Sequence, residues 1–578
     1  MDVQEEIDEN PVSPIELSIF KESLEQNFLT ILDLLPNKEK TLIIEQSCIF
    51  KLNYIASTKQ LIEKKVIKNF LFESKDFISP TPILIYMLPP SSELLKSIEK
   101  HIVLNEKKKV EFHIIFVPKI TIECSEFIEK SEYKTFFNIY NLNIDMYALD
   151  YDIISLEDYD AFNNIYVKDK YDCLSDLKRV IFKYEAAFGK IKYRFSKGPL
   201  AQKLNIILSE EKASFDNNKE NENLACFIFD RSVDLITPFC TNYVYEALID
   251  EYFNINFNTI KVNPKILEKE SKQNFIKIDL SRNNKFYTKI KDFHFSKTAS
   301  YLQERLKSRT EVLKEAKKNK NDIKKIYEDF VNANRVQEEN EPLKNNINLA
   351  DYISHERKIP IKTLYTNFEA NILVGVLPEK LHDFIDDEIS KKADKYSILK
   401  ILCLECIILG GIRYRIYEQF EKDFLDVYGY KNIILWKNLE KIGALKTQDN
   451  NFFFSTASTD LNLICPDIDE LNPNDSSYVF NGYCPIIIRL IEKAISQGWG
   501  SIKETLKKIP GETNFPVDET EIMNDNKEIK YFLVVFIGGI TYGELAAIRY
   551  LNNKNKNKKF VVLTTSMINY KNIFDSLS

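Results

Sequence analysis

The sequence is poor in the residue patterns that indicate metal binding. It has only five histidines in 578 residues, and its nine cysteines are scattered. The one close cysteine pair, Cys403 and Cys406, lies in an apolar helical stretch, and no second pair completes a zinc site. We therefore expect buried thiols in a reducing cytosol, with no metal ion and no other cofactor.

Membrane-spanning and basic segments are missing as well. No apolar run approaches the roughly 20 residues that a membrane-spanning helix needs. The acidic opening MDVQEEIDEN is not typical of a secretory signal peptide. The formal charge is −7 without a sustained basic stripe, which argues against nucleic acid as a partner. A chain of this kind that acts at a membrane is expected to be held there by other proteins.

Motifs for nucleotide and acid–base chemistry are also lacking. The sequence contains neither G-x-x-x-x-G-K-[ST] nor a complete G-x-G-x-x-G. The turn Gly538-Gly539 could bring backbone amides close to a phosphate at a helix start, so a nucleotide-binding protein is the alternative interpretation. We favour glycines that serve a tight strand-to-helix turn. No paired carboxylates or nucleophile–base pair stands out, so we predict that the protein is not an enzyme.

Two parts of the chain read as α/β. The runs TLIIEQ, PILIYML and EFHIIFVP alternate with helical or polar segments such as SSELLKSIEKHI, which predicts a parallel sheet from Thr41 to about Asp150. Further on, LACFIFD is a continuous apolar strand of the kind buried on both faces, and its partner strand can lie far away in the sequence. Near the C-terminus YFLVVFIGGITYGELAAIRYLNNKNKNKKFVVLTTS predicts strand, turn, helix and strand, and Thr541 and Glu544 have capping-box spacing.

Helical periodicity takes over from about Asn256 to Val479. One apolar stripe indicates a first helix, a second stripe indicates another, and the charged turn KKNKND joins them into a hairpin at about 295–331. The segment from Asn332 to Asn348 is predicted to be a loop. The stripes either close the core or present a face to a partner helix, and both interpretations are open. The first stripe consists of Tyr301, Leu302, Leu306, Val312 and Leu313, and the second of Ile323, Ile326, Tyr327, Phe330 and Val331.

The stretch FIFDRSVDLITP poses the question of an active site directly. Its apolar strand ends at Asp230, and Arg231 and Asp234 follow. Side chains at the carboxyl end of a parallel strand project into the crevice where α/β enzymes place their chemistry. The alternative is that the three charged residues pair locally and fix the turn.

Several motifs resemble those of a known family. DRSVDLITP followed by YEALIDEYF resembles the signature of the Sec/Munc proteins, which bind and chaperone SNARE helices in membrane fusion. Within that family the chain resembles the vacuolar protein sorting branch over nearly its whole length. The segments that carry this narrower resemblance are FHIIFVPK, YGYKNIILWKNLEKIGALK, DSSYVFNGYCPIIIRL, QGWGSIKETLKKIPG and VVFIGGITYGELAAIRYL.

The resemblance implies an arch of α/β domains with a mainly helical insertion. The expected parts are an N-terminal α/β domain (1–150), a middle α/β domain in two pieces (151–255 and 480–578) and an inserted helical domain (256–479) that carries the hairpin. It also implies that the charged and glycine residues singled out above form a structural signature and not a catalytic centre. These residues are Asp230, Arg231, Asp234, Gly538 and Gly539.

The resemblance further implies a binding function. The expected protein is a non-enzymatic subunit of HOPS- and CORVET-like tethering complexes that aligns SNARE helices in a groove between the first domain and the hairpin. It would be cytoplasmic and peripheral on endosome, lysosome or vacuole membranes, docked on the vacuolar protein sorting 16 subunit. Tyr430 and Ile433, in the pattern YGY-x-x-I, are the expected docking anchors, with simple core packing as the alternative. The expected SNARE-binding residues are those of the first apolar stripe.

Overall fold

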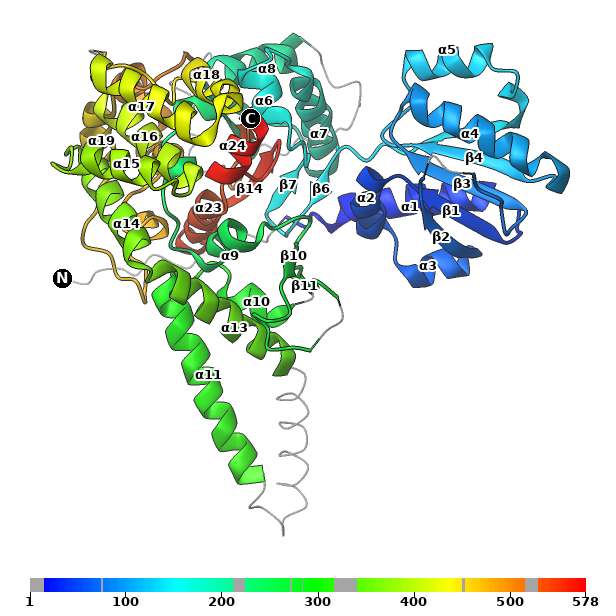
Figure 1. The fold of residues 1–578 in the computed structure, drawn as a ribbon, viewed down its shortest axis with the longest axis horizontal. Coiled ribbons are helices and arrows are strands. Elements are labelled where there is room, and N and C mark those ends of the chain that lie inside the picture. The colour runs from blue at the N-terminus through cyan, green and yellow to red at the C-terminus, as the bar shows by residue number, and fades with distance from the viewer. Residues whose placement is uncertain are drawn as a thin grey trace, which may run out of the picture. The chain divides into compact units, whose positions relative to one another are not determined.

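The computed structural model in Figure 1 describes residues 15–73, 76–210, 224–270, 273–282, 284–316, 340–449, 453–514 and 529–578. The chain divides into two compact units, one formed by Glu16–Tyr151 and the other containing Asp152–Ser578. Both units contain parallel sheet, and the second carries a large set of helices besides. The predicted fold class is therefore confirmed.

A five-stranded parallel sheet forms the centre of the first unit, in the order β2-β1-β3-β4-β5. All six residues of β3 are buried, because helices cover both faces of a parallel sheet. The predicted apolar runs correspond to β1, β3 and β4. The edge strands β2 and β5 were not predicted, since most of their residues are not buried and leave no apolar run. The strands of this sheet are β1 (Lys40–Ile44), β2 (Val66–Leu71), β3 (Ile83–Leu88), β4 (Glu111–Phe116) and β5 (Phe137–Asn141). The short β6 (Tyr147–Ala148) is not part of it.

Helices of this unit bury apolar stripes against the sheet. Leu95, Ile98 and Ile102 of one helix lie three and four residues apart and join the core made by β3 and β4. The helices are α1 (Ser18–Leu34), α2 (Ile49–Ile55), α3 (Thr58–Glu63), α4 (Ser92–Asn105) and α5 (Ile122–Lys130).

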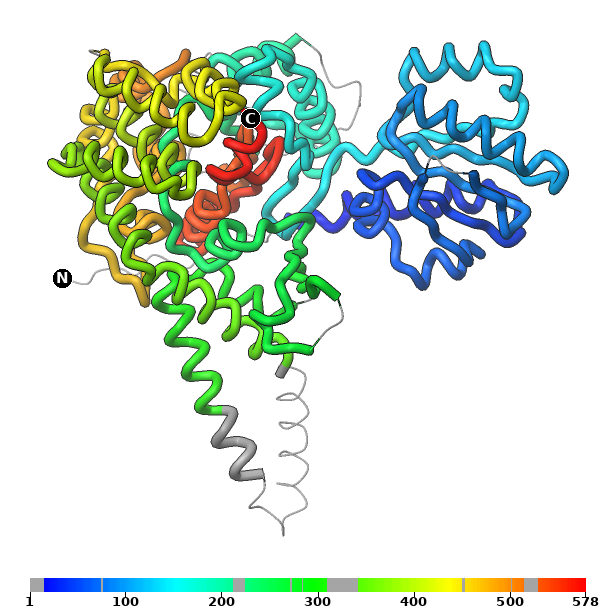
Figure 2. The backbone as a smooth tube through the Cα atoms, viewed as in Figure 1, coloured from blue at the N-terminus to red at the C-terminus, as the bar shows by residue number. Residues whose placement is uncertain are grey.

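The second unit is built around a larger sheet in which β12, β8, β9, β13, β14 and β7 follow one another. The strand LACFIFD is β9, and it pairs in parallel with β13, so that Phe227 lies opposite Val534. The prediction that its partner lies far away in the sequence is confirmed, and Figure 2 shows the red C-terminal segments inside this unit. The strands are β7 (Ile153–Ser155), β8 (Tyr193–Lys197), β9 (Leu224–Asp230), β12 (Thr513–Asn514), β13 (Tyr531–Ile537) and β14 (Lys559–Thr564).

The C-terminal βαβ prediction is also confirmed. Thr541 caps α23, and both hydrogen bonds of the predicted capping box with Glu544 are present. α23 packs on β14, and α8 packs on β8 and β9. The helices of this α/β part are α6 (Ala161–Tyr166), α7 (Asp172–Phe188), α8 (Pro199–Glu210), α9 (Tyr245–Phe253), α20 (Ile486–Gln497), α21 (Lys503–Lys508), α23 (Tyr542–Lys554) and α24 (Tyr570–Leu577).

The stretch from 256 to 479 is mainly helical but does not begin so. It opens with an antiparallel pair, β10 (Thr259–Val262) and β11 (Ile276–Asp279), which the prediction of helical periodicity missed. The loop predicted up to Asn348 is wrong from residue 340 onward, where α13 begins. The helices are α10 (Lys285–Ile290), α11 (Phe295–Ala316), α13 (Asn340–Arg357), α14 (Pro360–Leu373), α15 (Leu381–Ser390), α16 (Lys395–Leu409), α17 (Tyr414–Tyr428), α18 (Ile433–Lys441) and α19 (Phe453–Leu461).

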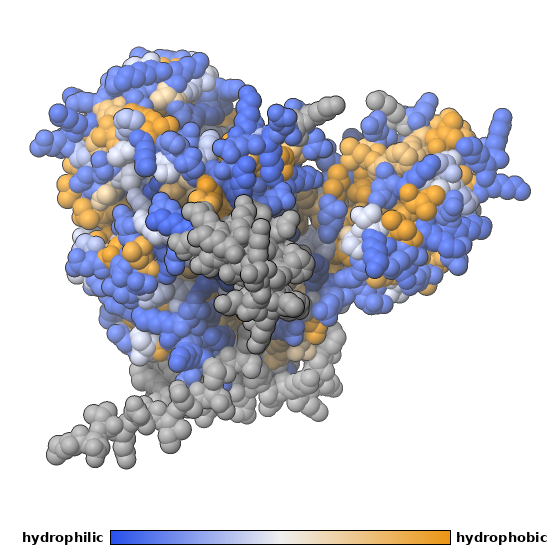
Figure 3. Space-filling view, turned by 90° about the horizontal axis from the view of Figure 1, so that it is seen from below, coloured by the Kyte–Doolittle hydropathy of each residue, from blue (hydrophilic) through white to orange (hydrophobic). Residues whose placement is uncertain are grey.

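Buried thiols and a largely hydrophilic exterior accompany this fold. Cys403 and Cys406 are fully buried in α16, as predicted. Figure 3 shows hydrophilic side chains over much of one face, with apolar side chains gathered in patches. Within the described ranges, none of the helices has the length and apolar character needed to cross a membrane.

Candidate functional site

The strand end at Asp230 is a closed corner of the larger sheet. The carboxylate of Asp230 is fully buried and accepts three hydrogen bonds, from the Tyr166 hydroxyl at 2.5 Å, from the Leu200 amide at 2.9 Å and from the Ser232 amide at 3.0 Å. One aspartate thereby ties β9 to α6 and to the start of α8. These bonds use the carboxylate for structure.

Arg231 and Asp234 lie in the same corner and meet a residue from the far end of the chain. The Nη1 atom of Arg231 donates to both carboxylate oxygens of Glu544, each at 2.9 Å, and Nη2 lies 3.6 Å from Asp234 Oδ2. All three side chains are fully buried. Burial by itself would lower the pKa of Arg231, but the charges of Glu544 and Asp234 outweigh burial and raise that pKa. Asp234 also accepts from the Ile486 amide at 3.1 Å, which fixes the start of α20.

The two glycines after β13 are required by close packing. Gly538 has a φ of 92° and Gly539 a φ of 102°, the region that favours glycine. A Cβ atom on Gly538 would lie 2.7 Å from the Tyr166 hydroxyl, and one on Gly539 would lie 2.5 Å from Ile568. Side chains therefore fill the space where a phosphate would approach this turn, which argues against the nucleotide-binding alternative.

These five residues are thus brought together, and their contacts support the structural interpretation. The cavities of about 810, 420 and 300 Å³ in the second unit are lined by other residues. The sequence did not reveal Tyr166 and Glu544 as the partners of Asp230 and Arg231, because no local pattern links residues more than 60 positions apart. That the corner takes no part in catalysis remains our prediction.

The predicted docking anchors lie on the surface at the junction of α17 and α18. Tyr430 is 67% exposed and Ile433 is 40% exposed, so the alternative of simple core packing does not hold for Tyr430. The Tyr430 hydroxyl donates to Asp426 at 2.9 Å, which fixes the ring at the surface. Sequence reasoning missed Ile434, which is 57% exposed, although a helix cannot bury three successive residues such as Ile433, Ile434 and Leu435 on one face.

Buried side chains of α17 and α18 pack beneath the exposed residues of this junction. Leu435, Trp436 and Leu439 of α18 are buried, and the Trp436 ring packs on Phe424 of α17 with ring centroids 5.4 Å apart. The Trp436 indole donates to the Tyr417 hydroxyl at 3.0 Å, so its polar atom is satisfied inside the core. The anchors are therefore presented by a well-packed pair of helices, as a docking surface requires.

The predicted SNARE-binding stripe divides between core and surface. Leu302 is only 4% exposed, and Tyr301 packs against Phe293 with ring centroids 5.8 Å apart, so the base of α11 belongs to the core. This excludes Leu302 as a contact for a partner helix. Leu306, one turn further along, is 49% exposed. The side chains of Val312 and Leu313, and the whole second stripe with Ile323, Ile326, Tyr327, Phe330 and Val331, lie outside the description.

Comparisons with known proteins agree with this architecture. The chain is 26% identical to vacuolar protein sorting-associated protein 33A of Rattus norvegicus, with 96% of each chain covered. It is also 26% identical to the vacuolar protein-sorting-associated protein 33 homolog of Arabidopsis thaliana, over 84% of this chain and 85% of that one.

Solved structures show a similar fold at low sequence identity. The SM protein Vps45 in complex with the Qa SNARE Tlg2 superposes with a TM-score of 0.64 at 15% identity, covering 97% of this chain and 98% of that one. The Unc18–syntaxin 1 complex of Monosiga brevicollis also gives 0.64, at 13% identity, covering 96% and 98%. Residues 40–576 match the Sec1 family. The match covers nearly the whole chain, and the chain therefore belongs to the Sec1 family.

Proposed function

We propose that this protein is a non-enzymatic, SNARE-binding subunit of a HOPS- or CORVET-like tethering complex. It assists vesicle docking and fusion at endosome, lysosome or vacuole membranes, as a cytoplasmic protein held there by a partner subunit. Membership of the Sec1 family and likeness to vacuolar protein sorting-associated protein 33 relatives along the chain support this function. The closed corner at Asp230 supports the absence of catalysis there.

The observation that carries the proposal is the exposed anchor pair on the α17–α18 junction. Tyr430 and Ile433 present large apolar surface to solvent while the helices beneath them are firmly packed. Exposed aromatic and aliphatic anchors of this kind can each contribute about 2 kcal/mol or more at an interface. We assign this surface to docking on the vacuolar protein sorting 16 subunit.

SNARE engagement is assigned to the exposed part of α11. Figure 1 shows this helix extending away from the sheet of its unit, and Leu306 is the described apolar residue on its exposed side. A SNARE motif is an unfolded chain with regularly spaced apolar residues, and each large apolar side chain that it buries stabilises the complex by about 1.5–3 kcal/mol. A preformed helix lowers the ordering entropy of assembly. The protein would therefore speed assembly stoichiometrically, with no covalent step and no nucleotide.

Co-purification of the two subunits tests the docking assignment. We expect Tyr430→Asp and Ile433→Lys each to abolish recovery of the vacuolar protein sorting 16 subunit without lowering the melting temperature of the isolated chain. Tyr414→Asp is the matched control, because Tyr414 is 63% exposed at the opposite end of the 15-residue α17, about 22 Å away. Intact recovery with both anchor variants, or equal loss with the control, would contradict the assignment.

A further inference from the structure

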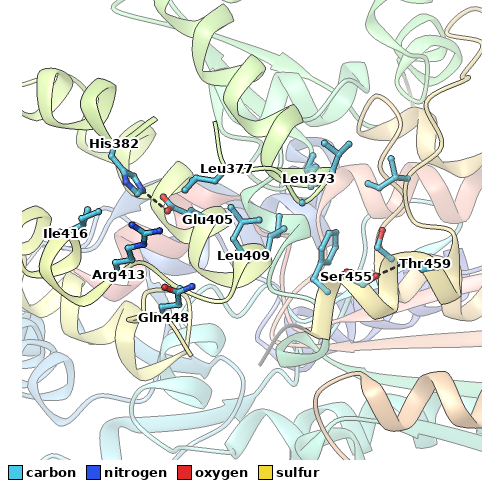
Figure 4. Close-up of a pocket in the computed structure, with 17 residues that line it drawn as sticks. Leu373, Leu377, His382, Glu405, Leu409, Arg413, Ile416, Gln448, Ser455 and Thr459 are labelled. Atoms are coloured by element: carbon cyan, nitrogen blue, oxygen red, sulfur yellow. Dashed lines mark hydrogen bonds and ion pairs between the residues drawn. The ribbon is translucent and has the colours of Figure 1, made fainter. Parts of the chain in front are cut away.

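A cavity of about 810 Å³ in the helical part of the second unit carries a binding site of its own. Figure 4 shows His382, Glu405 and Arg413 gathered at one side of this cavity, Ser455 and Thr459 at the other, and Leu373, Leu377 and Leu409 between them. The lining comes from α14, α15, α16, α17 and α19 and the loops that join them. Most of its walls are therefore held by helices, with aliphatic side chains between two polar ends.

The informative residue is Glu405 on α16, which is only 2% exposed. Its Oε1 accepts a hydrogen bond from His382 Nε2 at 2.7 Å. Its Oε2 has no hydrogen-bond partner within the described part of the chain. A buried acceptor without a donor destabilises a protein, and a charged acceptor does so more than a neutral one. Glu405 lines the cavity, so a carboxylate oxygen without a donor lies at its wall.

The surroundings of the cavity favour a positively charged donor. Asp383 and Asp386 act electrostatically on His382, and Asp423 acts on Asp386. All three aspartates lie outside the core, so negative charge besides that of Glu405 lies near the His382 side of the cavity. Among the described lining residues, Arg413 alone carries a permanent positive charge, and it is exposed, where water screens it. Four carboxylates, of Glu405, Asp383, Asp386 and Asp423, therefore lie against Arg413 and, when it is protonated, His382, and this balance favours a cationic ligand.

Exposed apolar residues at the rim of the cavity indicate that its ligand has apolar groups besides the positively charged one. Val374 is 56% exposed and Leu377 is 47% exposed, and both line the cavity. Val376, between them, is 53% exposed. This apolar rim continues the aliphatic wall outward, which fits apolar residues next to the cation along a peptide chain. On the opposite side the hydroxyl of Ser455 is available to the backbone of such a segment.

We propose that this cavity binds a segment of a partner protein in which a lysine or arginine is flanked by apolar residues. The aliphatic stem of the basic side chain packs on Leu409 and Leu377, its N–H donates to Glu405 Oε2, and the flanking residues cover the rim. The site is separate from the anchors Tyr430 and Ile433, because Arg413 and Tyr430 lie beyond opposite ends of α17. It gives the protein a third contact surface, besides those assigned to docking and to SNARE binding.

A displayed library of random 12-residue peptides, selected on the full chain and counter-selected on a Glu405→Gln variant, tests this site. We expect the enriched peptides to share a lysine or arginine between apolar residues. For a synthetic peptide from that pool, replacing the basic residue by norleucine should weaken binding at least about tenfold, as loss of a charge-assisted hydrogen bond predicts. The Glu405→Gln variant should bind the two peptides equally. This double-mutant comparison isolates the interaction between the basic residue of the peptide and Glu405.

Two further variants keep the test decisive. Glu379→Gln removes an exposed carboxylate near the rim and should leave binding unchanged. Leu377→Lys places a charge on the exposed rim without disturbing the core, and should abolish binding even if Glu405→Gln fails to fold. The proposal is overturned if no peptides are enriched or if the enriched peptides lack a basic residue. It is also overturned if the norleucine substitution weakens binding equally to the unaltered chain and to Glu405→Gln, or if the Leu377→Lys variant binds the peptide with unchanged affinity. None of these outcomes depends on recovery of the vacuolar protein sorting 16 subunit.

Discussion

The ion pair of His382 with Glu405 at the cavity should make the stability of the protein depend on pH. The hydrogen bond to Glu405 raises the pKa of His382, burial opposes this, and the charges of Glu405, Asp386 and Asp383 raise it further. A histidine whose folded pKa lies above its unfolded value of about 6.5 contributes its full stabilisation below that pH, and the contribution fades as the pH rises through the folded pKa.

We therefore predict that His382→Gln lowers the free energy of unfolding more at pH 5.5 than at pH 8.5. Urea unfolding of the variant and the unaltered chain at both pH values measures the difference. His355→Gln is the control, because the side chain of His355 is 79% exposed and its contact with Asp351 is long, at 3.6 Å. An equal or larger loss at pH 8.5 would show that the pair with Glu405 does not stabilise the charged histidine.

Buried contacts explain why an asparagine-rich segment forms a helix where its composition predicts a loop. The asparagine-rich segment up to Asn348 was predicted to be a loop, yet α13 begins at Asn340. Leu343, Leu349 and Ile353 form a buried stripe on this helix. Asn346 is also buried, and its Oδ1 accepts from the Tyr245 hydroxyl at 2.9 Å. Asparagine is a poor helix former by propensity, but tertiary contacts of this kind override a weak preference.

At the scale of single elements, two leucines of α11 are expected to have different roles, one in stability and the other in binding. Leu302→Ala should lower the free energy of unfolding by about 2–5 kcal/mol, because it truncates a buried leucine. Leu306→Lys should leave stability within about 0.5 kcal/mol, because the site is exposed, but should slow assembly of a cognate SNARE bundle. Melting curves and assembly rates on the same two variants measure both effects. Unchanged assembly by a folded Leu306→Lys would remove the described part of α11 from the binding face.

Elements with strong local signals were predictable, and those defined by tertiary position were not. β3, β4 and β9 are continuous apolar runs, and α23 has both a capping box and an apolar stripe, so the sequence alone indicated each of them. The edge strands β2 and β5 lack such runs, because most of their residues are exposed and need not be apolar. Likewise the sequence named Tyr430 and Ile433 by resemblance, whereas the cavity at Glu405 is assembled from five helices and has no local pattern.

At the scale of the whole molecule, strand order decides which parts unfold together. β9 lies between β8 and β13, so residues about 300 positions apart share one sheet. The ion pair of Arg231 with Glu544 joins the same two sequence pieces a second time. The five-stranded sheet β2-β1-β3-β4-β5 shares no strand with this sheet and belongs to the other compact unit, Glu16–Tyr151. Loss of this ion pair should therefore lower the stability of the whole second unit and leave the stability of the unit Glu16–Tyr151 unchanged.

Arg231→Met tests this in the intact chain. It leaves Glu544 and Asp234 buried without their cation, and breaking a buried pair in this way costs about 3–5 kcal/mol. Hydrogen exchange followed by mass spectrometry should show β8, β9 and β13 exchanging about a hundredfold faster or more, while β1, β3 and β4 keep their rates. The double variant Arg231→Met with Glu544→Gln keeps the capping-box hydrogen bonds, because glutamine also serves at that position. It should recover part of the protection, since one uncompensated charge is removed. If the strands of Glu16–Tyr151 lost protection to the same extent as β9, the two units would unfold as one.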